Sequence, residues 1–358
     1  MSPPMLPPND ANHLGLVYRH EATTLPWPAD SHTRPITDAH VHLNGIAAAR
    51  QFFAVADLFG IGRVWSQTQL EQVDAMRDAF GDRIEFVAVP NYLERDKPET
   101  FTSDWLRRLE AFGKKGVRIV KFWAGPRGRD LSPALRLDHP VRYQGMKLAQ
   151  AMGMMFMVHV ADPDTWFATK YTDVGKYDTK LAHYQPLERY LDEFADVPWM
   201  AAHLGGHPED LDHVQQLLDR HANLHVDTAA TKWMVRELSK QPGKFAAFCR
   251  RNIGRVLFGS DIVVQPEDAA KDPANPGLVF DLYASRYWAL RTLLETDYDG
   301  PSPIVDPDLC MVDPTLPAES CPPLRGAKLD PATLAAMYHD AAERLLDKRD
   351  AARHPPNI

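Results

Sequence analysis

Two histidines one residue apart, His40 and His42, have the residue type and the spacing to hold a metal ion together. They lie within residues 38–42, next to an aspartate. In an extended strand, residues two apart point to the same side, so both imidazoles can reach one point in space. His159 and Asp261 further along the chain add ligand types that suit zinc, or a harder divalent ion such as manganese. We therefore predict a metal site.

Short apolar or β-branched segments alternate with longer segments of helical period between residues 36 and 262. The segments expected to form strands are Ile36–Leu43, Arg63–Ser66, Ile84–Val89, Val117–Trp123, Met154–Val160, Trp199–Leu204, Asn223–Thr228 and Arg255–Ile262. Eight strand and helix pairs in a row predict a (β/α)₈ TIM barrel. A doubly wound open sheet is the alternative, but no Gly-x-Gly-x-x-Gly follows an early strand to favour it.

Proline-rich segments lie on both sides of this alternation. We expect residues 1–35 to form an N-terminal extension, 36–298 the barrel, and 299–358 an irregular loop with a closing helix packed on the barrel. Within the last part, residues 299–328 predict a long irregular excursion before a final helix from about Pro331 to Leu346. Loops of this length usually contact a partner or cover a site.

Polar side chains recur in the C-terminal halves of the predicted strands. They are His40, His42, Lys121, His159, His203 and Asp261. In a (β/α)₈ barrel these strand ends converge on the face that carries the active site. The positions therefore predict one cavity surrounded by imidazoles, a carboxylate and an ammonium group.

The segments that carry these residues resemble the amidohydrolase superfamily, in its amidohydrolase-related (amidohydrolase 2) branch of metal-dependent hydrolases and decarboxylases. The resemblance spans about 36–262, in the motifs 38–42, 158–160, 202–206 and 257–261, and continues in 338–346. The closing helix of that family usually reads Asn-Ala-x-Arg-Leu-Leu, so Asp340 and Ala342 are departures or near matches.

The resemblance implies one divalent ion, zinc or manganese, and a set of ligands for it. These ligands are His40, His42, His159 and Asp261. His203 would ligate a second ion or polarise a substrate carbonyl. In binuclear relatives a lysine on strand four is carboxylated and bridges two ions, so a second ion is expected only if Lys121 is carboxylated. Unmodified, Lys121 would pair with a substrate carboxylate or with Asp261.

The chemistry that such a site supports is hydrolysis. A divalent ion lowers the pKa of bound water toward about 7, and a neighbouring carboxylate can accept the proton as hydroxide attacks a carbonyl. Asp261 is the predicted proton shuttle, with His203 as the next candidate. We predict a metal-dependent hydrolase acting on an amide, lactone or ester. Two alternatives stay open: a metal-dependent decarboxylase, which is a lyase with much the same ligands, and a non-catalytic barrel that only binds metal.

Loop residues after the predicted strands four and five are candidates for substrate binding. They are Trp123, Arg127, Arg129 and Trp166, together with Arg286 further along the chain. Arginine offers a bidentate fork for a carboxylate, and tryptophan can stack on a flat ring. These residues favour an aromatic or carboxylate-bearing substrate. Alternatively, they are solvated charges and aromatic anchors of long loops.

Composition excludes several other classes of function. The formal net charge of −8 comes from interspersed acidic and basic residues, which gives no footprint for nucleic acid or an anionic membrane. No apolar run of about 18 residues predicts a membrane span. Cys249, Cys310 and Cys321 lack the spacing of a zinc or redox motif, and the start of the chain lacks an apolar signal segment. We expect a cytoplasmic protein with a small-molecule substrate, and homo-oligomerisation stays open.

Overall fold

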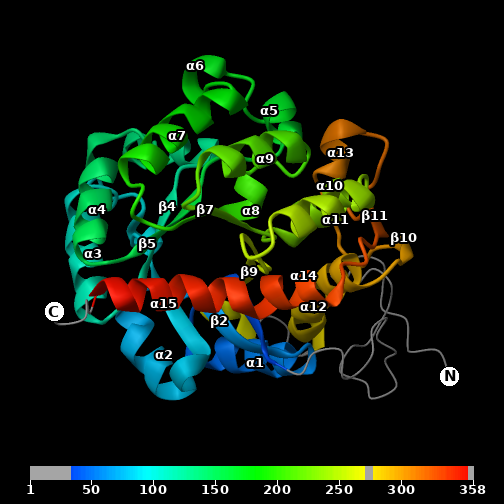
Figure 1. Ribbon diagram of the computed structural model, residues 1–358, viewed down its shortest axis with the longest axis horizontal. Coiled ribbons are helices and arrows are strands. Elements are labelled where there is room, and N and C mark those ends of the chain that lie inside the picture. Colours follow the sequence, from blue (N-terminus) through cyan, green and yellow to red (C-terminus); the bar gives the residue numbers. More distant parts are fainter. Residues whose placement is uncertain (1–33, 271–276, 354–358) are drawn as a thin grey trace. The chain divides into compact units, whose positions relative to one another are not determined.

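The computed structural model describes residues 34–270 and 277–353, in which strands and helices alternate along the chain (Figure 1). Nearly all of the predicted extension 1–35 therefore lies outside the described residues. The predicted alternation is confirmed, and the chain has the (β/α)₈ barrel fold. By its contacts the chain divides into two compact units, Met1–Val64 with Thr228–His339 and Trp65–Asp227 with Asp340–Ile358.

The second unit contains a parallel sheet in which strands adjacent in sequence are also paired. The strands are β3 (Ile84–Ala88), β4 (Ile119–Trp123), β5 (Met155–His159), β6 (Trp199–Ala201) and β7 (Leu224–Asp227). The longer helices of this unit are α2 (Val73–Phe80), α3 (Ser103–Lys114), α4 (Pro140–Ala151), α7 (Tyr184–Glu193), α9 (Leu211–Arg220) and α15 (Ala341–Arg353). Helices α3 and α4 lie side by side (Figure 1).

The register of this sheet separates an apolar face from a polar face. Phe156 of β5 is opposite Trp199 of β6, with ring centroids 4.9 Å apart, and its ring is 5.6 Å from that of Phe194 after α7. Neighbouring residues in a strand point to opposite faces. Lys121, which is opposite Met157, therefore lies on the other face, as does His159. The chemically reactive side chains are thus directed away from the aromatic packing against the helices.

The first unit pairs the first strand of the chain with two short strands near residue 260. Strand β1 (Ile36–Leu43) runs parallel to β9 (Ile262–Val264), and the amide of Ala39 donates to the carbonyl of Phe258, just after β8 (Val256–Leu257). The main helices here are α1 (Ile46–Leu58), α10 (Thr231–Leu238), α11 (Pro242–Arg251) and α12 (Gly277–Glu295). Strand β2 (Ile61–Gln67) continues the chain from the first unit into the second.

Most predicted strands were too long, and two of them run past residues with a left-handed backbone. The predicted strand Arg255–Ile262 is interrupted before Ile262, because Asp261 adopts a left-handed backbone conformation with φ of 59°. The predicted strand Trp199–Leu204 ends at Ala201, because His203 and Leu204 have φ of 62° and 50°. A left-handed residue cannot continue an extended strand. Both breaks therefore occur at or beside polar residues that the sequence marks as functional.

The proline-rich excursion 299–328 contains some regular structure. Strand β10 (Asp299–Pro301) pairs antiparallel with β11 (Pro323–Arg325), and a short helix, α13 (Leu309–Val312), lies between them. A buried ion pair joins Asp306 of this segment to Arg236 on α10. The predicted closing helix is built from α14 (Pro331–Ala335), a π-helical turn η8 (Ala336–Asp340) and α15. The excursion is thus anchored to a helix of its own unit.

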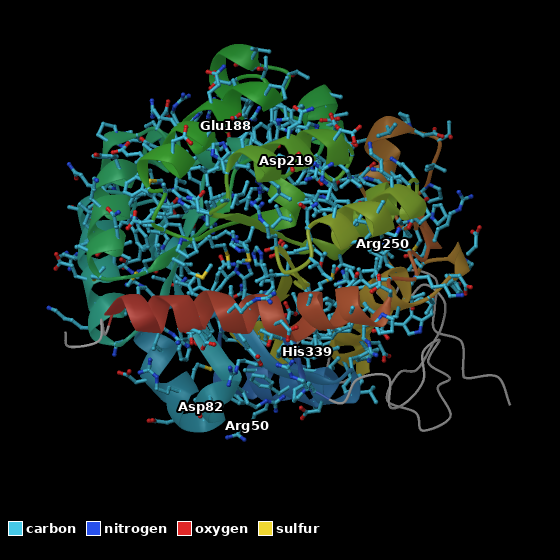
Figure 2. All side chains as sticks on the ribbon, in the orientation of Figure 1. Arg50, Asp82, Glu188, Asp219, Arg250 and His339 are labelled. Atoms are coloured by element: carbon cyan, nitrogen blue, oxygen red, sulfur yellow. The ribbon has the colours of Figure 1, made fainter. Side chains whose placement is uncertain are left out.

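Charged side chains such as those of Asp82 and Asp219 are exposed (Figure 2). Within the described residues, every helix is too short or too polar to cross a membrane.

Gly206 gives a test of the close packing of the segment that follows β6 and contains His203. Its φ is 74°, and a Cβ atom would lie 2.1 Å from the carbonyl oxygen of Ala161. Gly60 is a matched control, because it has the same φ of 74° but nothing described within 4 Å of its Cβ position. We expect Gly60→Ala to lower the free energy of unfolding by about 1–2 kcal/mol through backbone strain alone. Gly206→Ala should cost about 1–3 kcal/mol more, because the segment after His159 has to move. Equal losses in urea unfolding would contradict this packing.

Candidate metal centre

His40, His42 and Asp261 converge within the first unit. The Nε2 atoms of His42 and His40 lie 3.2 Å and 3.4 Å from Oδ1 of Asp261, and the ligand atoms of all three lie within 4.8 Å of one another. Ligand atoms that surround zinc tetrahedrally at about 2.0–2.2 Å are about 3.3–3.6 Å apart. The spacing of 3.4 Å lies in this range and that of 3.2 Å just below it, so both are close to those around a tetrahedral ion, and the nitrogen and oxygen donors fit zinc or manganese.

The elements that carry this triad fix each side chain differently. His40 is 1% exposed on β1, whereas His42, near the end of the same strand, has a side chain that is 30% exposed. Asp261 follows β8 in the left-handed conformation, and its amide donates to the carbonyl of His40 over 2.8 Å. A non-glycine residue in this region costs about 1–3 kcal/mol and persists where its surroundings impose it. The turn thus places the Asp261 carboxylate beside both imidazoles.

Asp38 supports this arrangement and was not singled out from the sequence. Its side chain is fully buried and accepts hydrogen bonds from the His40 amide, the Ser260 amide and hydroxyl, and the Tyr287 hydroxyl. Burial raises the pKa of Asp38 to about 7, although the hydrogen bonds oppose that shift. The period of two was the signal available in the sequence, because Asp38 lies two residues before His40 on the same strand.

His159 and His203 lie together in the second unit. Their rings are 4.6 Å apart between centroids, in an edge-to-face arrangement. Nε2 of His159 lies 2.8 Å from Oδ1 of Asp162, and the Asp227 carboxylate accepts the amide of His203 over 2.6 Å. Burial would raise the pKa of Asp162, but the neighbouring His159 and further hydrogen bonds hold it below its usual range. Asp162 and Asp227 are thus the carboxylate partners of the two histidines, and Asp227 is the one that the sequence did not single out.

Lys121 lies on β4 with 3% of its surface exposed. Its register partner is Met157, two residues before His159, so the lysine and that histidine share one face of the sheet. A buried ammonium requires a partner.

The residues predicted to bind substrate have varied surroundings. Trp123 is half-buried and packs against Tyr92, with ring centroids 5.8 Å apart. The ammonium of Lys170 lies over the ring of Trp166, 3.4 Å from the ring centroid. Arg286 of α12 donates within its own helix, to the Leu282 carbonyl and the Ser285 hydroxyl. Arg127 is exposed on η4 (Pro126–Asp130).

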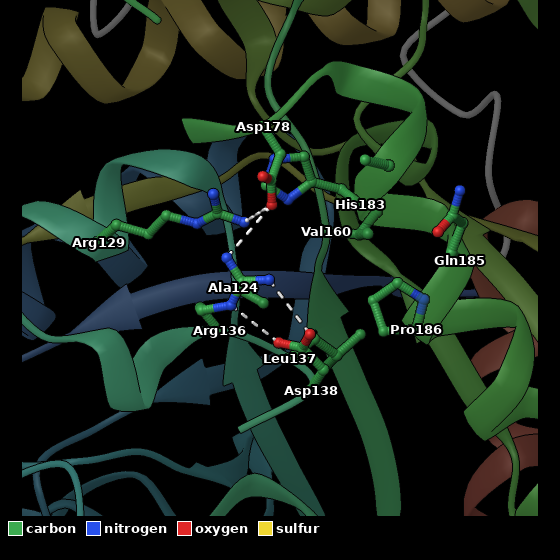
Figure 3. A pocket seen from close by; sticks show the side chains of 11 residues that line it. Ala124, Arg129, Arg136, Leu137, Asp138, Val160, Asp178, His183, Gln185 and Pro186 are labelled. Atoms are coloured by element: carbon green, nitrogen blue, oxygen red, sulfur yellow. Dashed lines mark hydrogen bonds and ion pairs between the residues drawn. The ribbon is translucent and has the colours of Figure 1, made fainter. Parts of the chain in front are cut away.

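Arg129 lines a cavity of about 250 Å³ in the second unit (Figure 3). Its guanidinium donates to Asp178 over 2.7 Å and to the Lys176 carbonyl over 2.7 Å. Val160 also lines this cavity. The two hydrogen bonds of Arg129 join the loop after β4 to the segment after β5, and Asp178 neutralises the charge of Arg129.

A second group of ligand types in this unit consists of Asp164, His207 and Glu209. The ammonium of Lys180 already lies among them, 2.7 Å from Oδ1 of Asp164 and 3.4 Å from Oε2 of Glu209. A metal ion here would have to displace this charge. The group is better described as an ion-pair network than as a metal centre.

The sequence model of the family described as amidohydrolase matches residues 16–348. The chain belongs to the amidohydrolase family. Its members include hydrolases and metal-dependent decarboxylases. No protein of curated function matches this amidohydrolase.

Several solved structures are similar to this amidohydrolase. An uncharacterised TIM-barrel protein of Bordetella bronchiseptica has 15% identity and a TM-score of 0.49, with coverage of 88% of this chain and 99% of that chain. A probable 2-pyrone-4,6-dicarboxylic acid hydrolase of Acinetobacter baumannii has 11% identity and a TM-score of 0.48, covering 87% and 99%. A 5-carboxyvanillate decarboxylase of Novosphingobium aromaticivorans, complexed with manganese, has 11% identity and a TM-score of 0.43, covering 74% and 94%. The family assignment rests on the sequence model.

Metal content tests the triad directly. We expect about one divalent ion per chain after purification without chelator, measured by elemental analysis. His42→Ala should lose most of it, because the triad loses one of its imidazoles. Asp164→Asn, in the Lys180 network, is the control and should keep the metal. Metal loss in Asp164→Asn together with metal retention in His42→Ala would place the ion at Asp164, His207 and Glu209 and not at the triad.

The Lys180 network predicts a pH-dependent stability. Burial and then the charge of Lys180 lower the pKa of His207 to about 4, whereas an unfolded histidine has a pKa of about 6.5. Between these values the unfolded chain binds the extra proton, so the free energy of unfolding falls as pH drops from about 6.5 to about 4. Urea unfolding at several pH values should show a flatter fall for His207→Gln than for the wild type. Parallel curves would contradict the shift.

Proposed function

We propose that this protein is a metal-dependent hydrolase that cleaves an amide, lactone or ester bond of a small substrate. The observation that carries the proposal is the spacing of 3.2 Å and 3.4 Å between Asp261 Oδ1 and the two imidazole nitrogens. This spacing suits one divalent ion, zinc or manganese, held by residues that leave room for further ligands. A divalent ion supplies electrostatic stabilisation of the developing negative charge and makes water a better nucleophile near neutral pH.

Asp261 has two roles in this proposal. Its Oδ1 faces His40 and His42, and its Oδ2 receives the proton of the attacking water and returns it to the leaving group. The side chain is 27% exposed, so a substrate can reach it. The left-handed backbone at Asp261 fixes the direction of the carboxylate before substrate binds. His203 is the second candidate for the proton transfer, and it would also polarise a substrate carbonyl.

The resemblance read from the sequence adds His159 as a further ligand. His159 is held by Asp162 at 2.8 Å, the kind of carboxylate contact that orients a metal-binding imidazole. Lys121 is proposed to be an unmodified ammonium, so that the site holds one ion. A second ion, with His203 among its ligands, would require Lys121 to be carboxylated.

The proposed substrate is aromatic or carries a carboxylate. Arg127 is the arginine best suited to meet such a carboxylate, because it is exposed on the loop after β4 whereas Arg129 is paired with Asp178. Trp123 offers an aromatic surface at the end of β4, and Trp166 offers one after β5. Arg286 is a further candidate, on α12 of the first unit.

A substrate panel tests the reaction. The metal-loaded protein should hydrolyse members of a set of aryl and carboxylate-bearing lactones, amides and esters, and a parallel set of aryl carboxylic acids should be assayed for release of CO₂. Asp261→Asn should lower kcat by at least about 10²-fold, because the amide is a poor base. Metal content of the variant is the control, since the loss in kcat has to exceed any loss of metal.

Release of CO₂ without hydrolysis would replace the proposal with a decarboxylase. Near-normal kcat in Asp261→Asn at full metal occupancy would assign the proton transfer to another residue. No reaction with either set, together with tight metal binding, would favour the non-catalytic alternative.

A further inference from the structure

The metal ligands of the first unit are linked to helix α12 through one buried carboxylate, that of Asp38. Oδ1 of Asp38 accepts the amide of His40 over 3.1 Å and the amide of Ser260 over 3.0 Å. Oδ2 accepts the Ser260 hydroxyl over 2.6 Å and the Tyr287 hydroxyl over 2.9 Å. An ionised carboxylate has about four acceptor positions, so these four donors fill them.

Each donor fixes a different part of the ligand set. The His40 amide belongs to a ligand residue, and Ser260 directly precedes the ligand Asp261. The carbonyl of His40 in turn accepts the Asp261 amide over 2.8 Å, so His40 is held from both sides of its backbone. The Ser260 hydroxyl also accepts the amide of Ile262 over 3.2 Å, which closes the turn around Asp261. The left-handed conformation of Asp261 is therefore maintained by bonds that pass through Asp38.

Tyr287 is rigidly held at the far end of this chain of bonds. Its side chain is fully buried on α12, and its ring packs against Phe52, Phe59 and Phe258 with centroids 5.9–6.4 Å away. This packing holds the hydroxyl 2.9 Å from Oδ2 of Asp38. The tyrosine thus supplies a donor whose position depends on the hydrophobic packing of α12 and not on the metal site itself.

We infer that Tyr287 and Ser260 are positioning residues that act through Asp38 to hold His40 and Asp261 at metal-binding distance. This inference rests on the proposed metal site and extends it to residues that do not touch the ion. Hydrogen-bond partners of metal ligands typically change metal affinity by about 10–100-fold when they are lost. Tyr287 therefore contributes to metal affinity and not only to packing.

Tyr283 provides a matched control on the same helix. It lies one turn before Tyr287, is 1% exposed, packs against Phe52, and donates its hydroxyl to the buried Asp268 over 2.8 Å. Tyr283→Phe and Tyr287→Phe thus remove the same group from the same kind of partner. Only Tyr287 is bonded to the carboxylate that holds the ligand residues.

The experiment measures zinc and manganese dissociation constants by chelator competition, and melting temperatures of the metal-free proteins. We expect both variants to lower the melting temperature, and Tyr287→Phe alone to weaken binding by about 10–100-fold. Ser260→Ala should weaken it similarly, since it removes bonds to Asp38 and Ile262. Wild-type affinity in Tyr287→Phe, or an equal loss in Tyr283→Phe, would overturn the inference alone. Failure of the wild type to bind either ion would overturn the proposed function and this inference with it.

Discussion

The buried carboxylate of Asp38 is the constraint on which the geometry of the candidate metal centre in the first unit depends. A carboxylate without exposed surface is tolerated only when donors satisfy its oxygens. Those donors come from β1, from the turn before Asp261 and from helix α12, so three distant segments have to meet at fixed distances. The strand end that carries His40 and His42 cannot slide relative to the Asp261 turn without breaking these bonds. The fold itself thereby sets the spacing between the two imidazoles and the Asp261 carboxylate.

The same device, a left-handed residue at a strand end, recurs in the second unit. His203 and Leu204 end β6 as Asp261 ends the extended path after β8, and each such residue costs about 1–3 kcal/mol. Buried hydrogen bonds hold both breaks, from the His203 amide to Asp227 and from the Asp261 amide to His40. A continuous strand would have followed strict alternation of side chains. The breaks direct the side chains of His203 and Asp261 to positions that strict strand alternation would not give.

Several charged side chains of the segments after β4 and β5 form ion pairs with one another or with neighbouring segments. Arg129 is paired with Asp178, and Lys180 is paired with Asp164. Charges neutralised in this way define the shape of a pocket more than they attract a substrate. Because Arg129 is paired and Arg127 is exposed, Arg127 is the arginine proposed to meet a substrate carboxylate.

The sequence by itself determined the alternation of strands and helices, the bounds of β1 at Ile36–Leu43, and the grouping of His40 with His42. These follow from local period and burial, which the residue pattern records directly. Only the tertiary structure decided where β6 and β8 break, that Asp38 bonds to Tyr287 across 249 positions, and that Arg129 is neutralised. The reason is physical: left-handed backbone at a non-glycine residue and the partners of buried charges are imposed by long-range contacts, which local propensity does not encode.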